Sequence, residues 1–322
     1  MLKSLFLIVI LAFSLHASMV SRTKVGMGTF ITISVGEEYK NHLENSFKIM
    51  SDVEASLSSY NPSSQIYQLN KNKEIELDFF TYEALKLSTK YYRQTDKHFD
   101  ITVGSITKDL YHFGEEERVP KESELQKAKV SFKDLYISKT KAFINEGVKV
   151  DLGGMGKGYG VDKVIEYLKS QGIDKAIVSA SGDIRCLGEC AIHVQNPFGE
   201  RYLASFEMES GEVGVSTSGN YNRYVKTKEN NHLINPKVKK PQQNFISITL
   251  ISKLPSADLD AYATAVSVMP VKLAYSFLAK QELAYIIMQN DGELRVSENI
   301  SEFVKNLVFY NGVEKQPSDI NN

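Results

Sequence analysis

The segment of residues 151–162 is the feature that most restricts how this chain can fold. It contains five glycines and Lys157, and an aspartate stands at each end. Glycine is needed where the backbone takes a positive φ or where another group must approach it closely. Clustered backbone N–H groups beside a lysine are also typical of phosphate sites. The segment therefore predicts a turn that either binds an anion or packs tightly against a sheet, and both interpretations remain open at this point.

Neither of the two familiar nucleotide-binding motifs fits this segment. The P-loop pattern would place Asp151 at its first glycine and Gly158 at its serine or threonine. The dinucleotide pattern requires a glycine at its sixth position. A frame that starts at Gly154 has Tyr159 there, and a frame that starts at Gly156 has Val161, so the pattern fails. Both motifs are excluded.

The residues on either side of the glycines predict a strand followed by a helix. Residues 148–152 alternate between apolar and polar, as a strand does. Apolar residues then recur with helical spacing from Val161 to Leu168, and Gly172 is placed as a stop. The glycines would thus form a strand-to-helix turn, where the N–H groups that begin the helix can face an anion.

Composition and charge are those of an ordinary globular protein. Hydrophobic residues make up 42% of the 322 residues, charged residues 24%, and the net charge is −1. This balance gives no reason to expect nucleic acid or an anionic membrane surface as a partner. The predicted strands outnumber the helices and do not alternate with them, which favours the α+β class, with one large domain or two that share a cleft.

The first 18 residues predict a cleaved secretory signal peptide. A basic start at Lys3 is followed by an apolar run over residues 5–15. This run is shorter than the ~20 residues that span a bilayer. No cysteine near the cleavage region offers a site for a lipid, so we expect residues 19–322 to be an exported, periplasmic and soluble protein without stable membrane insertion. Cys186 and Cys190 could form a disulfide there or remain two free thiols.

Other elements follow from apolar periodicity and turn residues. We expect a single strand over residues 25–35, helices over residues 42–57 and 81–95, and a turn at residues 58–64. Residues 114–129 should be a charged surface excursion, and residues 135–150 paired strands with a turn at 145–147. Further strands are expected at residues 176–179, 191–194, 203–208 and 245–250.

The last predicted helix, which follows Pro255, carries candidate metal ligands. Asp260 and Thr264 are four residues apart, so their side chains share one helix face. A carboxylate and a hydroxyl form the kind of partial oxygen site that Mg²⁺ occupies together with waters and substrate phosphates. Alternatively, Asp258 and Asp260 simply complement the helix dipole, with Thr264 as a small packing residue. Ser256 is available as the N-cap.

Two further segments of the C-terminal half contain polar groups suited to a site. Residues 216–221 gather hydroxyls at an expected turn, and His232 precedes an Asn-Pro turn. A lone histidine is more often structural than catalytic, so His232 by itself carries little weight.

Taken in order, these segments resemble the ApbE family, the FAD:protein FMN transferases. The resemblance covers nearly the whole chain after the leader, and its most specific parts are residues 151–162 and 260–264. Its other parts are residues 27–29, 60–64, 98–104, 181–183, 216–219 and 232–236.

The resemblance implies an α+β flavin-transferase fold of mixed or antiparallel sheets with flanking helices and a central FAD cleft. It implies Mg²⁺-dependent cleavage of FAD and transfer of FMN to a threonine or serine of exported or membrane-associated acceptor flavoproteins of electron-transport systems. It implies Gly154, through its carbonyl, Asp260 and Thr264 as metal ligands, and His232 as the group at the transfer centre, with a role in proton transfer. The residues that it implies as FAD contacts are Met27, Tyr60, Phe99, Asp100, Asp151, Lys157 and Ile234.

Three departures from the family pattern leave alternatives open. Asn235 stands where the family usually has aspartate, Lys239 and Lys240 replace Thr-Gly, and Ser181 replaces the first glycine of Gly-Gly-Asp. The first could weaken a metal contact or reorient His232, and the second changes a loop that could meet the acceptor. Asn235 and the altered loop leave open a non-catalytic FAD-binding protein. An FAD pyrophosphatase that releases free FMN and AMP is the other alternative, because the same metal and phosphate groups would serve water as the nucleophile.

Overall fold

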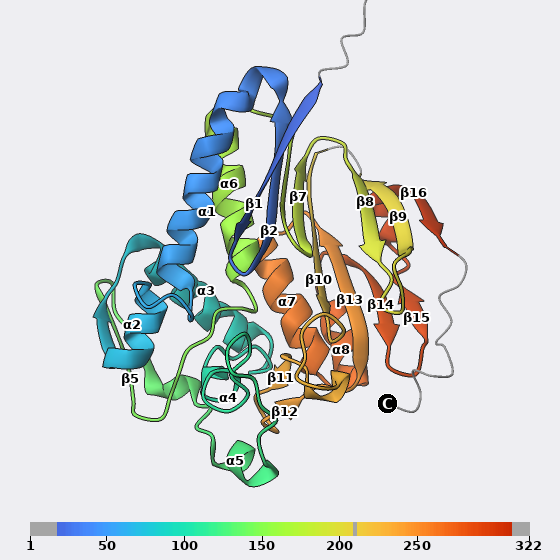
Figure 1. Cartoon of the computed structure of the whole chain (residues 1–322). Helices are drawn as coiled ribbons and strands as arrows, with labels where there is room; N and C mark the ends of the chain where they lie inside the picture. Colours follow the sequence, from blue (N-terminus) through green and yellow to red (C-terminus); the bar gives the residue numbers. More distant parts are fainter. Residues whose placement is uncertain (1–17, 209–210, 311–322) are drawn as a thin grey trace, which may run out of the picture.

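The computed structural model describes residues 18–208 and 211–310 and confirms the α+β class. Its main sheet has eight strands in the order β1-β2-β6-β7-β10-β13-β14-β15, and every neighbouring pair is antiparallel (Figure 1). The strands are β1 (Met19–Gly26), β2 (Thr29–Gly36), β6 (Ala176–Ala180), β7 (Asp183–Leu187), β10 (Glu212–Gly219), β13 (Phe245–Ser252), β14 (Ala284–Gln289) and β15 (Leu294–Val296).

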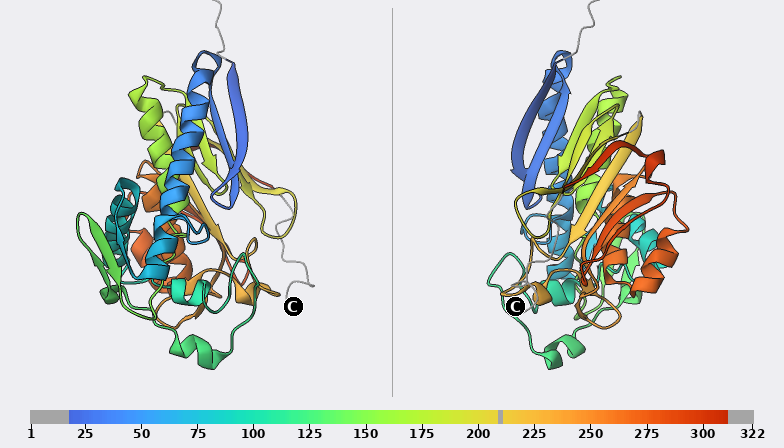
Figure 2. Two further views of the ribbon diagram at one scale, coloured as in Figure 1. Left: turned by 60° about the vertical axis from the view of Figure 1, so that its left-hand side comes forward. Right: turned by 90° about the vertical axis from the view of Figure 1, so that its right-hand side faces the viewer.

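Helices cover one face of the main sheet and a second sheet covers the other (Figure 2). The helical layer is built on α1 (Leu43–Leu57), α6 (Gly156–Ser170) and α7 (Ser256–Val268). The second sheet is antiparallel, in the order β16-β9-β8, and comprises β8 (Ala191–Gln195), β9 (Tyr202–Met208) and β16 (Val304–Phe309). Apolar side chains between the layers form the core, since each face of the main sheet is buried by one of them.

The remaining elements lie mostly around the end of α7, in the lower part of Figure 1. They are the helices α2 (Gln65–Asn72), α3 (Phe79–Gln94), α4 (Gly104–Thr107), α5 (Glu122–Lys127) and α8 (Val271–Leu278), and the strands β3 (Glu74–Glu76), β4 (Leu135–Ile137), β5 (Lys141–Ile144), β11 (Ile234–Asn235) and β12 (Lys240–Pro241). Short 3-10 helices occur at Glu37–His42, Phe132–Asp134, Lys228–Asn230 and Ile300–Glu302.

Residues 25–35 do not form the single strand that we predicted. The chain instead turns at Met27 and Gly28, so β1 and β2 pair as an antiparallel hairpin. Both turn residues have a positive φ, 52° at Met27 and 72° at Gly28. The alternation from Phe30 onward is real, but it belongs to β2 alone, because two left-handed residues in succession reverse the chain.

The segment before the glycines is not a strand. Lys149 makes an isolated bridge to Val103, and the backbone of Val150 is paired by the side chain of Asn70 at 2.7 and 2.8 Å. The sequence alternates there because alternate side chains are buried, although no sheet is present. The prediction that the hairpin turns at residues 145–147 is also wrong, because the paired strands β4 and β5 are joined by residues 138–140.

The glycines serve close helix packing, and no positive φ is found from residue 151 to 162. Helix α6 begins at Gly156, five residues before the predicted start, so three glycines lie inside it. A Cβ on Gly158 would lie 2.3 Å from the Ser256 carbonyl oxygen, and one on Gly154 would lie 2.9 Å from Thr264 Cγ2. The prediction of a tight turn was therefore right about the packing but wrong about its partner, which is helix α7 and not a sheet.

Helix α7 is the buried centre of the helical layer. All of its residues other than Thr264 are buried, as expected for a helix that is apolar on most sides. Ser256 is its first residue and not its N-cap as predicted. The carboxylate of Asp162 on α6 instead accepts hydrogen bonds from the backbone N–H groups of Ser256 and Ala257, at 2.7 and 2.9 Å.

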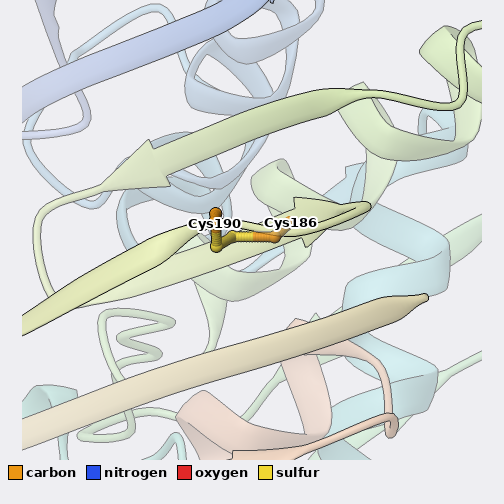
Figure 3. Close-up of a disulfide and its surroundings, with 2 residues drawn as sticks. All are labelled: Cys186 and Cys190. Carbon is orange, nitrogen blue, oxygen red and sulfur yellow. A yellow bond between two sulfur atoms is a disulfide. The ribbon is translucent and has the colours of Figure 1, made fainter. Parts of the chain in front are cut away.

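The two cysteines form a disulfide between the end of β7 and the start of β8 (Figure 3). Sequence left this pair open between a disulfide and free thiols. The bond lies where the chain leaves the main sheet for the second sheet, so it fixes the point at which the two sheets connect.

Most of the other predicted elements are confirmed, with shifted ends. They are α1, α3, β6, β8, β9 and β13, and the charged excursion of residues 114–129 includes the short helix α5. Residues 216–218 belong to strand β10 and not to the expected turn, because a hydroxyl-rich sequence is typical of turns but does not exclude a strand. Among the described residues, no helix has both the length and the apolar character needed to cross a bilayer.

Replacing Gly158 with alanine should destabilise the fold. The new methyl group would overlap the backbone of Ser256, so the α6–α7 crossing would have to open, at a cost of about 3 kcal/mol. Gly199→Ala is the matched control, since its Cβ would meet nothing within 4 Å. Urea unfolding measures both variants, and equal stability of the two would contradict this account of the glycines.

Candidate functional site

Lys157 joins the glycine segment to the last long helix. Its ammonium lies 2.9 Å from Asp183 Oδ2 and 3.3 Å from Asp260 Oδ2. Asp183 begins strand β7 and also accepts a hydrogen bond of 2.5 Å from the hydroxyl of Ser216 on β10. One half-buried cation therefore ties together α6, α7 and the main sheet.

The two carboxylates leave this cluster with one negative charge more than Lys157 balances. Burial, together with the negative charge of Asp183, raises the pKa of Asp260 to about 7, although Lys157 and the N–H of Gly158 oppose this. The same pair of carboxylates outweighs burial at Lys157 and raises the pKa of its ammonium. A cation bound at Asp260 would relieve the repulsion between the carboxylates.

Two of the three residues implied as Mg²⁺ ligands, Gly154 and Thr264, lie in contact, and Asp260 is one helical turn before Thr264. Gly154 packs against Thr264, and Gly158, four residues further along, packs against Asp260. Thr264 is the one residue of α7 that is not buried, so the surface of the helix is accessible at that point. A carboxylate, a hydroxyl and a carbonyl are hard donors that suit Mg²⁺ with retained waters. The described residues contain no group of three or more His, Cys, Asp or Glu suited to a metal, so any metal site here must use such mixed donors.

The start of α6 is less open to an anion than the sequence predicted. The N–H of Gly156 bonds to the carbonyl of Leu152 at 2.9 Å, and the N–H of Gly158 bonds to Asp260 Oδ2 at 3.1 Å. The chain thus supplies its own acceptors there. The charge that remains available for an anionic ligand is the ammonium of Lys157.

Asp151 is held as a half-buried carboxylate just before the glycines. Its oxygens accept hydrogen bonds from the hydroxyl of Thr107 at 2.7 Å and from the N–H of Gly153 at 2.9 Å. Burial acts to raise the pKa of Asp151, but the nearby ammonium of Lys108 and these hydrogen bonds outweigh it and lower the pKa. The N–H of Asp151 also bonds to the carbonyl of Ile101, at 2.8 Å.

That backbone bond places the segment of Phe99 and Asp100 beside Asp151. The ring of Phe99 is buried against Gly154. Asp100 accepts hydrogen bonds from the N–H and the hydroxyl of Thr102, and burial raises its pKa to about 6. Met27, in the β1–β2 turn, packs against Gly160 of α6.

Arg223 connects Tyr60 with His232. Its guanidinium donates to the Tyr60 hydroxyl, and its backbone carbonyl lies 3.0 Å from His232 Nδ1. Because a carbonyl only accepts, Nδ1 carries the proton and Nε2 is left as the acceptor. Burial and the charge of Arg223 lower the pKa of His232 to about 4, so the imidazole is neutral at physiological pH.

The departures around His232 have structural partners in this chain. The amide of Asn235 donates to the Val268 carbonyl at the end of α7, at 2.7 Å, which a carboxylate could not do. Lys239 donates to the Gln126 carbonyl, and Lys240 pairs with Glu122, so this loop is tied to α5. Ile234 is buried in the adjoining apolar cluster. Ser181 takes a φ of 59° at a position where glycine would be unstrained.

Sequence reasoning gave no role to three charged residues of the site. Asp183 lay in a segment singled out only by resemblance, while Lys108 and Arg223 carried no motif at all. Their partners are distant in the sequence, so no local pattern could reveal them.

The model of the ApbE family matches residues 27–287, and the chain belongs to this family. The match includes every residue of the arrangement just described.

Its curated relatives are FAD:protein FMN transferases. The protein from Escherichia coli K12 is 25% identical in an alignment of 294 residues that covers 83% of this chain and 83% of its own. The protein from Haemophilus influenzae is 29% identical over 287 residues, covering 80% of this chain and 81% of its own.

Solved structures show the same fold. The ApbE protein from Thermotoga maritima has a TM-score of 0.82 at 24% identity and covers 90% of this chain and 100% of its own. The flavin transferase ApbE from Vibrio cholerae has a TM-score of 0.76 at 25% identity, with coverage of 89% and 99%.

Without metal, stability should fall as pH rises from about 4 to 7. Folding raises the pKa of Asp260 from 3.8 to about 7, so in this window the folded protein keeps a proton that the unfolded chain has released. Asp260→Asn should reduce the pH-dependent loss of unfolding free energy by an amount on the order of 3 kcal/mol. The remaining loss comes from Asp100 and Asp162, because burial raises the pKa of each to about 6.

The measurement is urea unfolding in chelator at pH 4.5 and pH 8. The control is Asp52→Asn, which removes a carboxylate paired with Lys48 on the surface of α1. If Asp260→Asn kept the full slope of the wild-type protein, the electrostatic account of the cluster would be wrong.

Proposed function

We propose that this chain is a Mg²⁺-dependent FAD:protein FMN transferase. The observation that carries the proposal is the meeting of Gly154, Lys157, Asp260 and Thr264 from two segments a hundred residues apart, within a chain of the ApbE family. The relatives' activity supports the reaction, and the site supplies groups suited to each of its parts.

The metal would be held by the carboxylate of Asp260, the hydroxyl of Thr264 and the carbonyl of Gly154. Two observations support this assignment: the excess negative charge beside Lys157 and the exposure of Thr264 on an otherwise buried helix. When bound, Mg²⁺ neutralises charge that develops on the pyrophosphate.

The chain's own residues would bind and orient FAD around that point. Lys157 is placed to hold a phosphate oxygen by its ammonium, which costs no rearrangement because two carboxylates already fix it. The remaining contacts proposed for FAD, in the cleft that the family implies, are Met27, Tyr60, Phe99, Asp100, Asp151 and Ile234.

His232 would accept the proton of the attacking hydroxyl. The oxygen of an acceptor threonine or serine forms a bond to the FMN phosphorus, the bond to the AMP oxygen breaks, and AMP leaves. The hydroxyl proton passes to Nε2, which the Nδ1 contact with Arg223 leaves free.

The setting of the reaction is part of the proposal. Residues 1–18 would be a cleaved export signal, of which residues 1–17 lie outside the described part, and residues 19–322 would form one catalytic domain. The acceptors would be exported flavoproteins or outward-facing electron-transport subunits.

Incubation of residues 19–322 with FAD, Mg²⁺ and an acceptor domain tests the proposal. We expect one covalent FMN on the acceptor, seen by mass spectrometry, for each AMP released. Free FMN with AMP would favour the pyrophosphatase instead. FAD binding that does not respond to Mg²⁺, with no AMP, would favour a binding protein.

Asp260→Ala should retain FAD binding and lose turnover by about 10²- to 10³-fold, since metal contributes several kcal/mol to charge stabilisation. Flavin fluorescence measures binding, and AMP release measures turnover. Asp52→Ala, on the surface of α1, serves as the control. Unchanged turnover in Asp260→Ala would remove Asp260 from the site.

The rate of transfer at saturating Mg²⁺ should not fall between pH 8 and pH 5.5 on account of His232. A pKa lowered to about 4 keeps its imidazole neutral across this range, whereas an ordinary histidine would be protonated below about 6.5. Single-turnover rates at several pH values measure this. A loss of rate centred near pH 6.5 that disappears in His232→Gln would contradict the lowered pKa of His232.

A further inference from the structure

A buried lysine without a hydrogen-bond partner lies beside the proposed FAD contacts. Lys108 is 7% exposed, and its ammonium nitrogen is shielded from solvent with no partner among the described residues. The proposed reaction gives this residue no part, and the family resemblance assigns it none.

The backbone around Lys108 is held by a hydrogen bond and by close packing, so the fold sets the point from which its buried side chain extends. Lys108 directly follows the short helix α4 as its C-cap, and its N–H bonds to the carbonyl of Gly104 at 2.9 Å. Gly104 in turn packs so closely on Lys149 that a Cβ would lie 2.5 Å from its carbonyl oxygen.

The ammonium lies against two residues proposed to contact FAD. It sits over the face of the Tyr60 ring, whose hydroxyl is bonded by Arg223. The carboxylate of Asp151 is close enough to attract it, but that carboxylate accepts its hydrogen bonds from Thr107 and Gly153.

Such a group is costly in the ligand-free protein. Burying an ammonium without hydrogen bonds is unfavourable, and a contact with an aromatic face offsets only a part of the cost. Burial outweighs the attraction of Asp151 and lowers the pKa of Lys108 to about 8, so the charge is retained at neutral pH against its surroundings. A ligand that brings acceptor oxygens would remove this penalty.

We propose that Lys108 is a substrate-binding residue whose ammonium donates hydrogen bonds to an acceptor oxygen of bound FAD. The inference rests on the proposed function, because it takes FAD as the ligand. The oxygen belongs either to the pyrophosphate or to a carbonyl of the flavin ring, and both are acceptors that an ammonium seated between Tyr60 and Asp151 can serve.

The inference makes affinity and stability change in opposite directions. Lys108→Met keeps the length of the side chain and removes the ammonium. We expect this variant to bind FAD about 10- to 100-fold more weakly, as for loss of a charge-assisted hydrogen bond. We also expect its ligand-free form to be at least as stable as the wild-type protein, because a buried charge has been removed.

The experiment compares wild type, Lys108→Met and Lys149→Met. Lys149 is the matched control, since it is a neighbouring lysine whose ammonium already pairs with Asp109. Fluorescence titration without Mg²⁺ or acceptor gives FAD affinity, and thermal unfolding gives ligand-free stability. Lys149→Met should match the wild-type protein in affinity.

Titrations with riboflavin, FMN and ADP distinguish the two sources of the oxygen. Weaker riboflavin binding by Lys108→Met would identify a flavin carbonyl. Weaker binding of FMN or ADP, with riboflavin unchanged, would identify a phosphate.

Two results would overturn the inference. One is FAD affinity in Lys108→Met within twofold of wild type. The other is a variant that loses affinity and ligand-free stability together, since that would show a structural role. Failure of the wild-type protein itself to bind FAD would instead overturn the proposed function.

Discussion

The ion pairs of Lys157 with Asp183 and Asp260 are the interaction on which the site depends. They join α6, α7 and the main sheet, and the pair of Lys157 with Asp260 links residues 103 positions apart. Removing Lys157 would leave the two buried carboxylates without a balancing charge, which is strongly unfavourable. The close α6–α7 crossing, which Gly158 permits, brings the charges within reach.

The two helices also cap one another. Asp162 of α6 accepts the first N–H groups of α7, and Asp260 of α7 accepts the N–H of Gly158 in the first turn of α6. A carboxylate at a helix N-terminus is favoured by the dipole and by the unsatisfied donors there. Each helix therefore fixes the rotation of the other and its position along the helix axis. The candidate metal ligands on the two segments are held in place as a result.

Much of the fold followed from the sequence, because periodicity and turn residues act locally. Helices α1 and α3 and several strands were predicted for this reason, and so was the pairing of Asp260 with Thr264 on one face of α7. The β1–β2 hairpin was missed because Phe30 and its neighbours alternate without marking the turn at Met27. The glycines were correctly taken as sites of close approach, but their partner is a helix far along the chain.

The electrostatic part of the site could not be predicted in the same way. Lys108, Asp183 and Arg223 have no distinctive neighbours in the sequence, and their roles come from burial and from charges that only the fold brings near. The shift of the His232 pKa is likewise a tertiary effect, since Arg223 and burial produce it. Residue type gave the candidate chemistry, and the three-dimensional structure decided which charges act together.

The most direct test of this account is a crystal structure of the protein with FAD and Mn²⁺ in place of Mg²⁺, in which anomalous scattering locates the metal. The account predicts one metal peak within about 2.5 Å of the Asp260 carboxylate, the Thr264 hydroxyl and the Gly154 carbonyl, with a phosphate oxygen of FAD as a further ligand. A metal peak elsewhere, or a pyrophosphate remote from Lys157, would contradict it.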